Sequence, residues 1–305
     1  MRTKLSIIIA VLFFLVVLGI FAVVRFDNLL ASVHRQFVDP VIIVANNMAI
    51  SYPPIFPQSP AKHDHQPGYL MEKPIPQPSG TIRIPVLIYH HVGPIPPGTP
   101  PDYYVTPGVF ALQLKYLQDN NYQVITPQQF YDQIASGNNP TTKEVLLTFD
   151  DGYLDNYLYA YPLLKQYGYS GTFAIIVGKL TDTDHMTAKQ LLDMSNNGMI
   201  ISSHSITHPD LARISNAKLQ EELGNSKMRL ENITGKQVNV LIYPGCSYNG
   251  NVISVAQSIG YKMAFTCGSK IDNKLAWKYR FYRIHIYDRM DDFVNRLAGI
   301  DKYPY

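Results

Sequence analysis

The sequence predicts an α/β fold built on parallel strands, because short apolar runs rich in Val, Ile, Phe and Tyr alternate with helical patterns from Ile84 onward. The alternation of strand and helix repeats about seven times, which requires crossover connections and therefore parallel strands. Since the strands are continuous apolar runs, both faces of the sheet should be covered. A doubly wound open sheet and a barrel share this pattern, and the number of repeats favours an irregular (β/α)7-type barrel.

The individual elements are predicted from apolar periodicity and from their end signals. Strands are expected at residues 84–91, 122–126, 144–149, 171–177, 199–204, 238–244, 261–267 and 280–287. Helices are expected at residues 107–121, 127–137, 154–168, 187–198, 216–235, 251–260 and 290–299. The first helix places Phe110, Leu114 and Leu117 on one face. Glycines close several of the others, as left-handed C-terminal caps do, at Gly137, Gly168, Gly198, Gly235 and Gly260.

The N-terminal segment predicts a membrane anchor. Leu5 to Val24 is a run without charged residues that is long enough to span the roughly 30 Å hydrocarbon core of a bilayer. No clear cleavage site follows Val24, so residues 1–26 are interpreted as an uncleaved signal anchor, with a cleaved signal as the alternative. A single-pass protein of the cell membrane is expected, with a short tail in the cytoplasm and the domain at residues 84–305 outside the cell.

Residues 27–83 are expected to link this anchor to the domain. Proline is dense between Ser51 and Ser79, and because proline lacks a backbone donor and favours extended conformations, we interpret the segment as a semi-rigid stalk. The formal net charge is +3 and the chain has no strongly basic cluster, which argues against nucleic acid as a partner.

Carboxylates and imidazoles follow two of the predicted strands. Asp150 and Asp151 come directly after the third strand, His204 ends the fifth, and His208 lies four residues further on. Asp-Asp-Gly can be a simple turn, but two carboxylates beside a buried strand also indicate a cation. Two His and one carboxylate leave room on a divalent ion for water, and the second carboxylate can act as a general base. The pattern therefore indicates metal-assisted hydrolysis, without telling which Asp has which role.

The motifs "TFDDG" (148–152) and "HSITH" (204–208) resemble those of the polysaccharide deacetylases, carbohydrate esterase family four, also called the NodB homology domain. The resemblance covers roughly Ile84 to Leu297, and "PVLIYHHVG" (85–93) is similar to the subgroup of biofilm poly-N-acetylglucosamine deacetylases. It implies an irregular (β/α) barrel that removes acetyl groups from N-acetylated sugars with a divalent ion, zinc being preferred. It further implies these roles: Asp150 as base, and Asp151, His204 and His208 as metal ligands.

A later segment, "LIYPGCSYN" (241–249), departs from the family pattern. Pro244 fits, but Ile242 stands where many relatives have Arg, and Gly245 stands where they have an aromatic residue. The resemblance implies that a backbone N–H of this segment helps to hold the oxyanion, and since no side chain is needed for it, Gly245 or its neighbour can still be the donor. Arg283 from the last strand is our candidate to replace the missing Arg that orients the base, the alternative being a surface cation.

The resemblance also implies a histidine general acid from the final strand, and His285 is nearest that place. His90 and His91, at the end of the first strand, are the alternatives. Aromatic and adjacent residues near the motifs are predicted to contact substrate: Tyr153, Pro244, Tyr248 and His90.

Two cysteines, Cys246 and Cys267, lie at or just past the ends of consecutive predicted strands. In an oxidising compartment, and if those strands are neighbours, they are expected to form a disulfide that holds the loop at Gly245.

The predicted function is therefore metal-dependent removal of N-acetyl groups from an extracellular N-acetylglucosamine-containing polysaccharide, either peptidoglycan or an exopolysaccharide. Two alternatives are a domain that binds glycan without turning it over and a deacetylase of another glycan, such as acetylated xylan.

Overall fold

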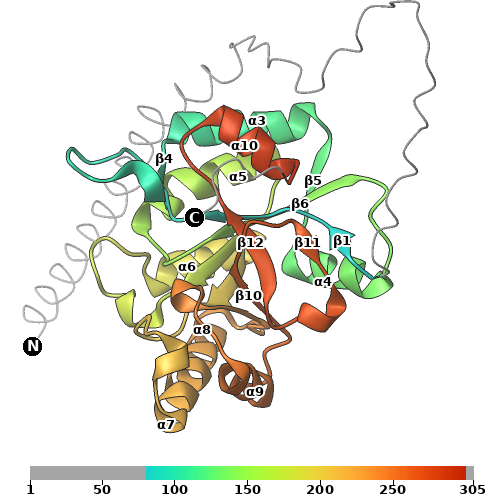
Figure 1. Ribbon diagram of the computed structural model, residues 1–305. Helices are drawn as coiled ribbons and strands as arrows, with labels where there is room; N and C mark the ends of the chain where they lie inside the picture. Colours follow the sequence, from blue (N-terminus) through green and yellow to red (C-terminus); the bar gives the residue numbers. More distant parts are fainter. Residues whose placement is uncertain (1–79, 300–305) are drawn as a thin grey trace, which may run out of the picture. The chain divides into compact units, whose positions relative to one another are not determined.

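The computed structural model describes residues 80–299, and its centre is a closed barrel of seven parallel strands (Figure 1). Around the ring the strand order is β2, β12, β10, β9, β8, β7, β6, and β6 pairs with β2 to close it. The barrel strands are β2 (Val86–Tyr89), β6 (Lys143–Phe149), β7 (Thr172–Ile175), β8 (Ile200–Ser203), β9 (Val240–Ile242), β10 (Met263–Cys267) and β12 (Phe281–His285). The predicted barrel is confirmed, and the open sheet is excluded by the β2–β6 pairing.

One predicted strand lies outside this ring. β5 (Tyr122–Val124) pairs with the first half of β6, where Val124 faces Val145, whereas β2 pairs with the second half from Leu146 onward. β6 thus pairs first with β5 and then, further along its length, with β2.

Two small sheets flank the barrel. β3 (His91–Val92) pairs in parallel with β4 (Tyr104–Val105), and β1 (Ile82–Arg83) pairs antiparallel with β11 (Asp272–Asn273). Because Ile82 is fully buried, the packed domain includes the last two residues of the segment predicted as linker.

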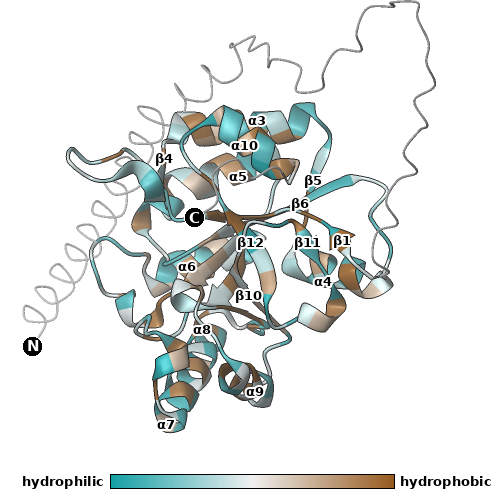
Figure 2. Cartoon of the chain, viewed as in Figure 1, coloured by the Kyte–Doolittle hydropathy of each residue, from teal (hydrophilic) through white to brown (hydrophobic). Residues whose placement is uncertain are grey.

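Helices surround the barrel, and Figure 2 shows hydrophobic and hydrophilic residues alternating around α3 and α7. The helices are α3 (Pro107–Asp119), α4 (Pro127–Ser136), α5 (Tyr161–Tyr167), α6 (Ala188–Asn196), α7 (Asn216–Gln220), α8 (Ser226–Thr234), α9 (Gly250–Ile259) and α10 (Met290–Leu297). α4 and α6 begin with reciprocal capping boxes, Thr126 with Gln129 and Thr187 with Gln190. Glycine in the left-handed conformation ends α4, α5, α8 and α9.

Two helices that the sequence predicts as continuous are interrupted by π-helical turns, η3 (Asn156–Ala160) before α5 and η6 (Glu221–Asn225) between α7 and α8. Short 3-10 turns occur at η2 (Pro101–Tyr103), η4 (Val177–Lys179), η5 (Leu211–Arg213), η7 (Pro244–Cys246) and η8 (Leu275–Trp277).

The interior of the barrel changes character along the strands. Side chains on one face of a strand recur every second residue, so Phe281, Arg283 and His285 of β12 point the same way. Phe281 belongs to a buried apolar cluster that draws on six strands of the ring, including Leu146 of β6. One step further along each strand the residues are Arg283 and Thr148, which hydrogen-bond to each other. The apolar interior therefore gives way to polar side chains towards the carboxyl ends of the strands.

Within residues 80–299, no helix combines the length and apolar character that crossing a membrane requires. The predicted anchor at residues 1–26 and the proline-rich stretch before residue 80 lie outside the described residues.

Candidate active site

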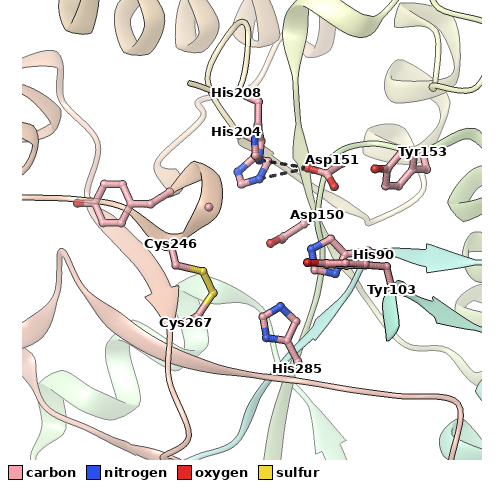
Figure 3. A pocket seen from close by; sticks show the side chains of 12 residues that line it. His90, Tyr103, Asp150, Asp151, Tyr153, His204, His208, Cys246, Cys267 and His285 are labelled. Carbon is pink, nitrogen blue, oxygen red and sulfur yellow. Dashed lines mark ion pairs between the residues drawn. A yellow bond between two sulfur atoms is a disulfide. The ribbon is translucent and has the colours of Figure 1, made fainter. Parts of the chain in front are cut away.

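A cavity of about 430 Å³ opens at the carboxyl ends of the barrel strands (Figure 3). Apart from Tyr103 of η2, its lining residues lie at or just after the carboxyl ends of six barrel strands, in agreement with the rule that barrel sites form at this end. They are His90, Tyr103, Asp150, Asp151, Tyr153, His204, His208, Tyr243, Gly245, Cys246, Cys267 and His285.

Asp151, His204 and His208 converge on one side of this cavity. One potential ligand atom from each lies within 4.8 Å of the other two. The Asp151 Oδ1 atom is 3.4 Å from His204 Nε2 and 3.6 Å from His208 Nε2, as the dashed lines in Figure 3 mark. A carboxylate oxygen and two imidazole nitrogens at this separation form a donor set that suits a divalent ion.

The hydrogen bonding of His204 supports this reading. Its Nδ1 atom donates to the carbonyl oxygen of Ile242 at 2.8 Å, which leaves Nε2 as the unprotonated nitrogen that a metal requires. Burial opposes a charge on His204, yet the two neighbouring aspartates, Asp151 first, raise its pKa when no cation is present. A bound ion would replace the proton that His204 otherwise takes up at Nε2. Burial and the nearby His204 lower the pKa of His208.

Backbone strain marks two of these three potential ligands. Asp151 has φ 70° and His208 has φ 59°, values in the left-handed region that residues other than glycine seldom adopt. Such conformations persist where the surrounding contacts hold them, and they concentrate at functional sites. The sharp turn after β6 continues into Gly152 at φ 82°.

Asp150 lies beside the metal-binding group and is held by Arg283. The guanidinium donates from Nη1 to Oδ1 at 2.7 Å and from Nη2 to Oδ2 at 2.9 Å. Arg283 is 0% exposed and Asp150 is 4% exposed, so Arg283 is not a surface cation. Burial alone would raise the pKa of Asp150, but the Arg283 charge and hydrogen bonds hold it well below its ordinary value. Asp150 is therefore a carboxylate at neutral pH.

In Figure 3 His285 lies on the side of Asp150 away from His204 and His208, and His90 lies below Asp151; the rings of His285 and His90 are parallel, with centroids 5.4 Å apart. Burial, reinforced by the positive charges nearby, lowers the pKa of His285 to about 3. Burial also lowers the pKa of His90. Both imidazoles are neutral near pH 7.

The segment after β9 carries the predicted disulfide, and the structure confirms the bond between Cys246 and Cys267, whose Cα atoms are 5.4 Å apart. Thr266 adds a hydrogen bond from its hydroxyl to the Cys246 carbonyl oxygen at 2.9 Å. Gly245 lines the cavity with φ 54°, which glycine adopts without strain. Its role at an oxyanion stays a prediction.

The predicted substrate contacts divide into two groups. Tyr153 and His90 line the cavity, where burial and the charge of Asp151 raise the pKa of Tyr153. Pro244 and Tyr248 are not among the lining residues. The Tyr248 ring stacks on that of Tyr243, with ring centroids 5.2 Å apart. The contact of Pro244 and Tyr248 with substrate stays a prediction.

Two lining residues were missed from the sequence. Tyr243 is fully buried and directly precedes Pro244, so its place in the motif could have indicated it. Tyr103 is 58% exposed and belongs to a proline-rich loop without any recognisable pattern, so no sequence signal pointed to it.

His91 takes no part in the cavity wall. Its ring lies between Tyr104 and Tyr153, with centroids 4.2 and 3.6 Å away, and its Nδ1 atom is 2.6 Å from Asp155 Oδ2. These contacts give His91 a supporting position behind Tyr153.

The mouth of the closed parallel barrel carries a carboxylate pair, two histidines and a potential divalent-ion site. These features place the chain in the class of (β/α)-barrel hydrolases. Comparison with known proteins then specifies the family. The polysaccharide deacetylase family matches residues 137–264. The putative polysaccharide deacetylase YxkH of Bacillus subtilis (strain 168) is 31% identical over 204 residues, or 67% of this chain and 71% of YxkH. The chain belongs to the polysaccharide deacetylase family, whose members are hydrolases.

Two further relatives agree. The peptidoglycan-N-acetylmuramic acid deacetylase PdaA of Bacillus subtilis (strain 168) is 31% identical over 157 residues, which cover 50% of this chain and 58% of PdaA. The structure of the deacetylase PplD of Streptococcus pyogenes, in complex with acetate, has a TM-score of 0.67 and 29% identity, and the match covers 72% of this chain and 98% of PplD.

Proposed function

We propose that this chain removes N-acetyl groups from an N-acetylglucosamine-containing polysaccharide of the cell envelope. The observation that carries the proposal is the convergence of Asp151, His204 and His208 beside the Asp150–Arg283 pair. The three ligands would hold a divalent ion, and imidazole with carboxylate suits zinc. When bound, such an ion acidifies water and polarises a carbonyl group.

Asp150 is the proposed general base. Its carboxylate is ionised, and each oxygen keeps further acceptor capacity although Arg283 occupies one direction on each. Arg283 therefore fixes the plane of the carboxylate and leaves it able to accept a proton from water in the cavity. This arrangement supports the proposed replacement of the family's usual Arg by one from β12.

His285 is the proposed general acid. It is neutral in the resting protein, because its pKa is lowered to about 3, so it cannot supply a proton of its own to a leaving amine. The proton that Asp150 accepts earlier in the reaction balances the one that the amine must receive. His285 and its parallel neighbour His90 line the same cavity as Asp150 and can pass that proton on.

The substrate class rests on the family and on the lining of the cavity. PdaA is named for action on N-acetylmuramic acid in peptidoglycan. Tyr103 and Tyr153 offer aromatic surface at the cavity of this chain, which suits the apolar faces of sugar rings. We further propose that the domain works outside the cell, anchored by the apolar run Leu5–Val24, since a disulfide in the cavity wall is typical of an oxidising compartment.

The test is acetate release by the purified full-length chain from N-acetylglucosamine oligomers, from peptidoglycan and from acetylated xylan, with added Zn²⁺. Release from the first two is expected, a chelator should abolish it, and Asp150→Asn should lower it by at least about a hundredfold, the lower end of a general base's contribution. Asp102→Asn, at an exposed carboxylate, is the matched control. Glycan binding with no acetate release would favour the non-catalytic alternative, and release from xylan alone would change the substrate.

A further inference from the structure

The segment His204–His208, which we call the HSITH segment, holds two of the three potential metal ligands in an unfavourable backbone shape. Ser205 has φ 65° and His208 has φ 59°, so two of its five residues occupy the left-handed region. This shape costs free energy and would relax without external support. The direction of both imidazoles therefore depends on what holds the segment.

One side of the segment is held by backbone and hydroxyl contacts. Val177 and Gly178 of η4 donate their N–H groups to the carbonyl oxygens of Ser205 and Ile206, at 3.1 and 2.8 Å. Within the segment, the His208 N–H donates to Ser205 Oγ at 3.0 Å.

The other side is held by one buried carboxylate. Glu222 lies in the π-helical turn η6 and is 0% exposed. Its Oε2 atom accepts the N–H groups of Ile206 at 2.8 Å and Thr207 at 2.9 Å, and its Oε1 atom accepts the Thr207 hydroxyl at 2.7 Å. Lys218 Nζ, 3.6 Å from Oε1, is the nearest cation.

The position of Glu222 is unusual for its residue type. Glutamate is almost never fully buried unless it is paired, and here three donors from the HSITH segment compensate its desolvation. A π-helical turn changes the direction of a side chain relative to a regular helix, and such turns are frequent at functional sites. All three donors come from residues between the two histidines.

We propose that Glu222 is a positioning residue for the metal site, holding Ile206 and Thr207 so that His204 and His208 on either side converge with Asp151. The inference rests on the metal site of the proposed function. Glu222 touches neither the ligands nor the cavity, and it acts through the backbone that joins the two histidines.

The experiment titrates Co²⁺ into the metal-free full-length chain and follows its visible absorption, which reports both affinity and coordination geometry. Glu222→Ala removes all three acceptors, and the Co²⁺ affinity should fall about 10- to 100-fold, as for other residues that orient metal ligands. In Glu222→Gln one oxygen can still accept both backbone N–H groups while the amide faces the Thr207 hydroxyl, so a loss of several-fold, smaller than that of the Ala variant, is expected.

Glu221→Ala is the matched control, because Glu221 is the neighbouring carboxylate, pairs with the same Lys218 at 3.1 Å and is 51% exposed. Its Co²⁺ affinity and spectrum should equal those of the unsubstituted chain. Equal affinity in folded Glu222→Ala and Glu221→Ala would overturn the inference, and if the Ala variant does not fold, unchanged affinity in Glu222→Gln does so. If the unsubstituted chain takes up no Co²⁺, the proposed metal site itself is wrong and the inference falls with it.

Discussion

The Arg283–Asp150 pair gives the sharpest prediction on stability. The side chains are 0% and 6% exposed, and Arg283 donates two hydrogen bonds to the carboxylate and one to Thr148. Arg283→Met keeps an unbranched side chain but leaves Asp150 as an uncompensated buried charge. Breaking a buried pair in this way costs about 3–5 kcal/mol, or two to four orders of magnitude in the unfolding equilibrium.

A double variant separates the charge from the packing. Arg283→Met combined with Asp150→Asn removes the stranded charge, so more than half of the lost stability should return. Urea unfolding of the metal-free full-length chain at pH 7, followed by circular dichroism, measures all three proteins. A loss below about 1 kcal/mol in Arg283→Met would refute the reasoning, because that is the value of an exposed pair.

The pH dependence of the same pair has a sign that can be tested. In the unsubstituted chain the pKa of Asp150 is depressed, so the contribution of Asp150 to the free energy of unfolding is fully present above about pH 4 and is lost as the pH falls further. Without Arg283 the dominant effect on Asp150 is burial, which raises its pKa above the unfolded value. Arg283→Met should therefore gain stability relative to the unsubstituted chain as the pH falls from 7 to 5, and a parallel fall in both would contradict this.

Three other predictions concern separate parts of the site. Because the pKa of His285 is lowered to about 3, its contribution to the free energy of unfolding is fully present above about pH 6.5 and is lost as the pH falls below that value. Between pH 6.5 and 4.5, the free energy of unfolding measured in urea should therefore fall by about 2 kcal/mol more in the unsubstituted chain than in His285→Asn. The joint variant Cys246→Ser, Cys267→Ser opens a loop of sequence separation 21 and should cost about 3 kcal/mol, and an unchanged melting temperature would contradict this. A Cβ on Gly178 would lie 2.6 Å from a backbone oxygen of the HSITH segment, so Gly178→Ala should weaken Co²⁺ binding in the same titration, whereas Gly224→Ala, with no contact nearer than 3.9 Å, should not.

The sequence predicts the barrel well because its signals are local. Strand and helix periods, together with glycine caps such as Gly137 and Gly260, depend on neighbouring residues, and these elements appear where expected. The site motifs "TFDDG" and "HSITH" are also local, and the rule for strand ends brings them together.

What the sequence could not predict depends on distance along the chain or on backbone detail. Arg283 and Asp150 are 133 residues apart, so their contact exists only once β6 and β12 are both in the ring. The π-helical turn that carries Glu222 leaves no periodic trace, and so the helix at 216–235 looked continuous. Tyr103 reaches the cavity from a loop whose path is set by proline and by pairing with β3 rather than by a motif.

The every-second-residue order on β12 ties three separate tasks to one strand alignment. Phe281 packs in the buried apolar cluster, Arg283 pairs with Asp150, and His285 lies at the carboxyl end of the strand, each two positions from the next. A one-residue slip of β12 against β10 and β2 would turn all three outward at once and bring Tyr282 and Ile284 inward. Such a slip would disturb the apolar packing and the cavity together, so a register shift of β12 should be far less tolerated than a point substitution there.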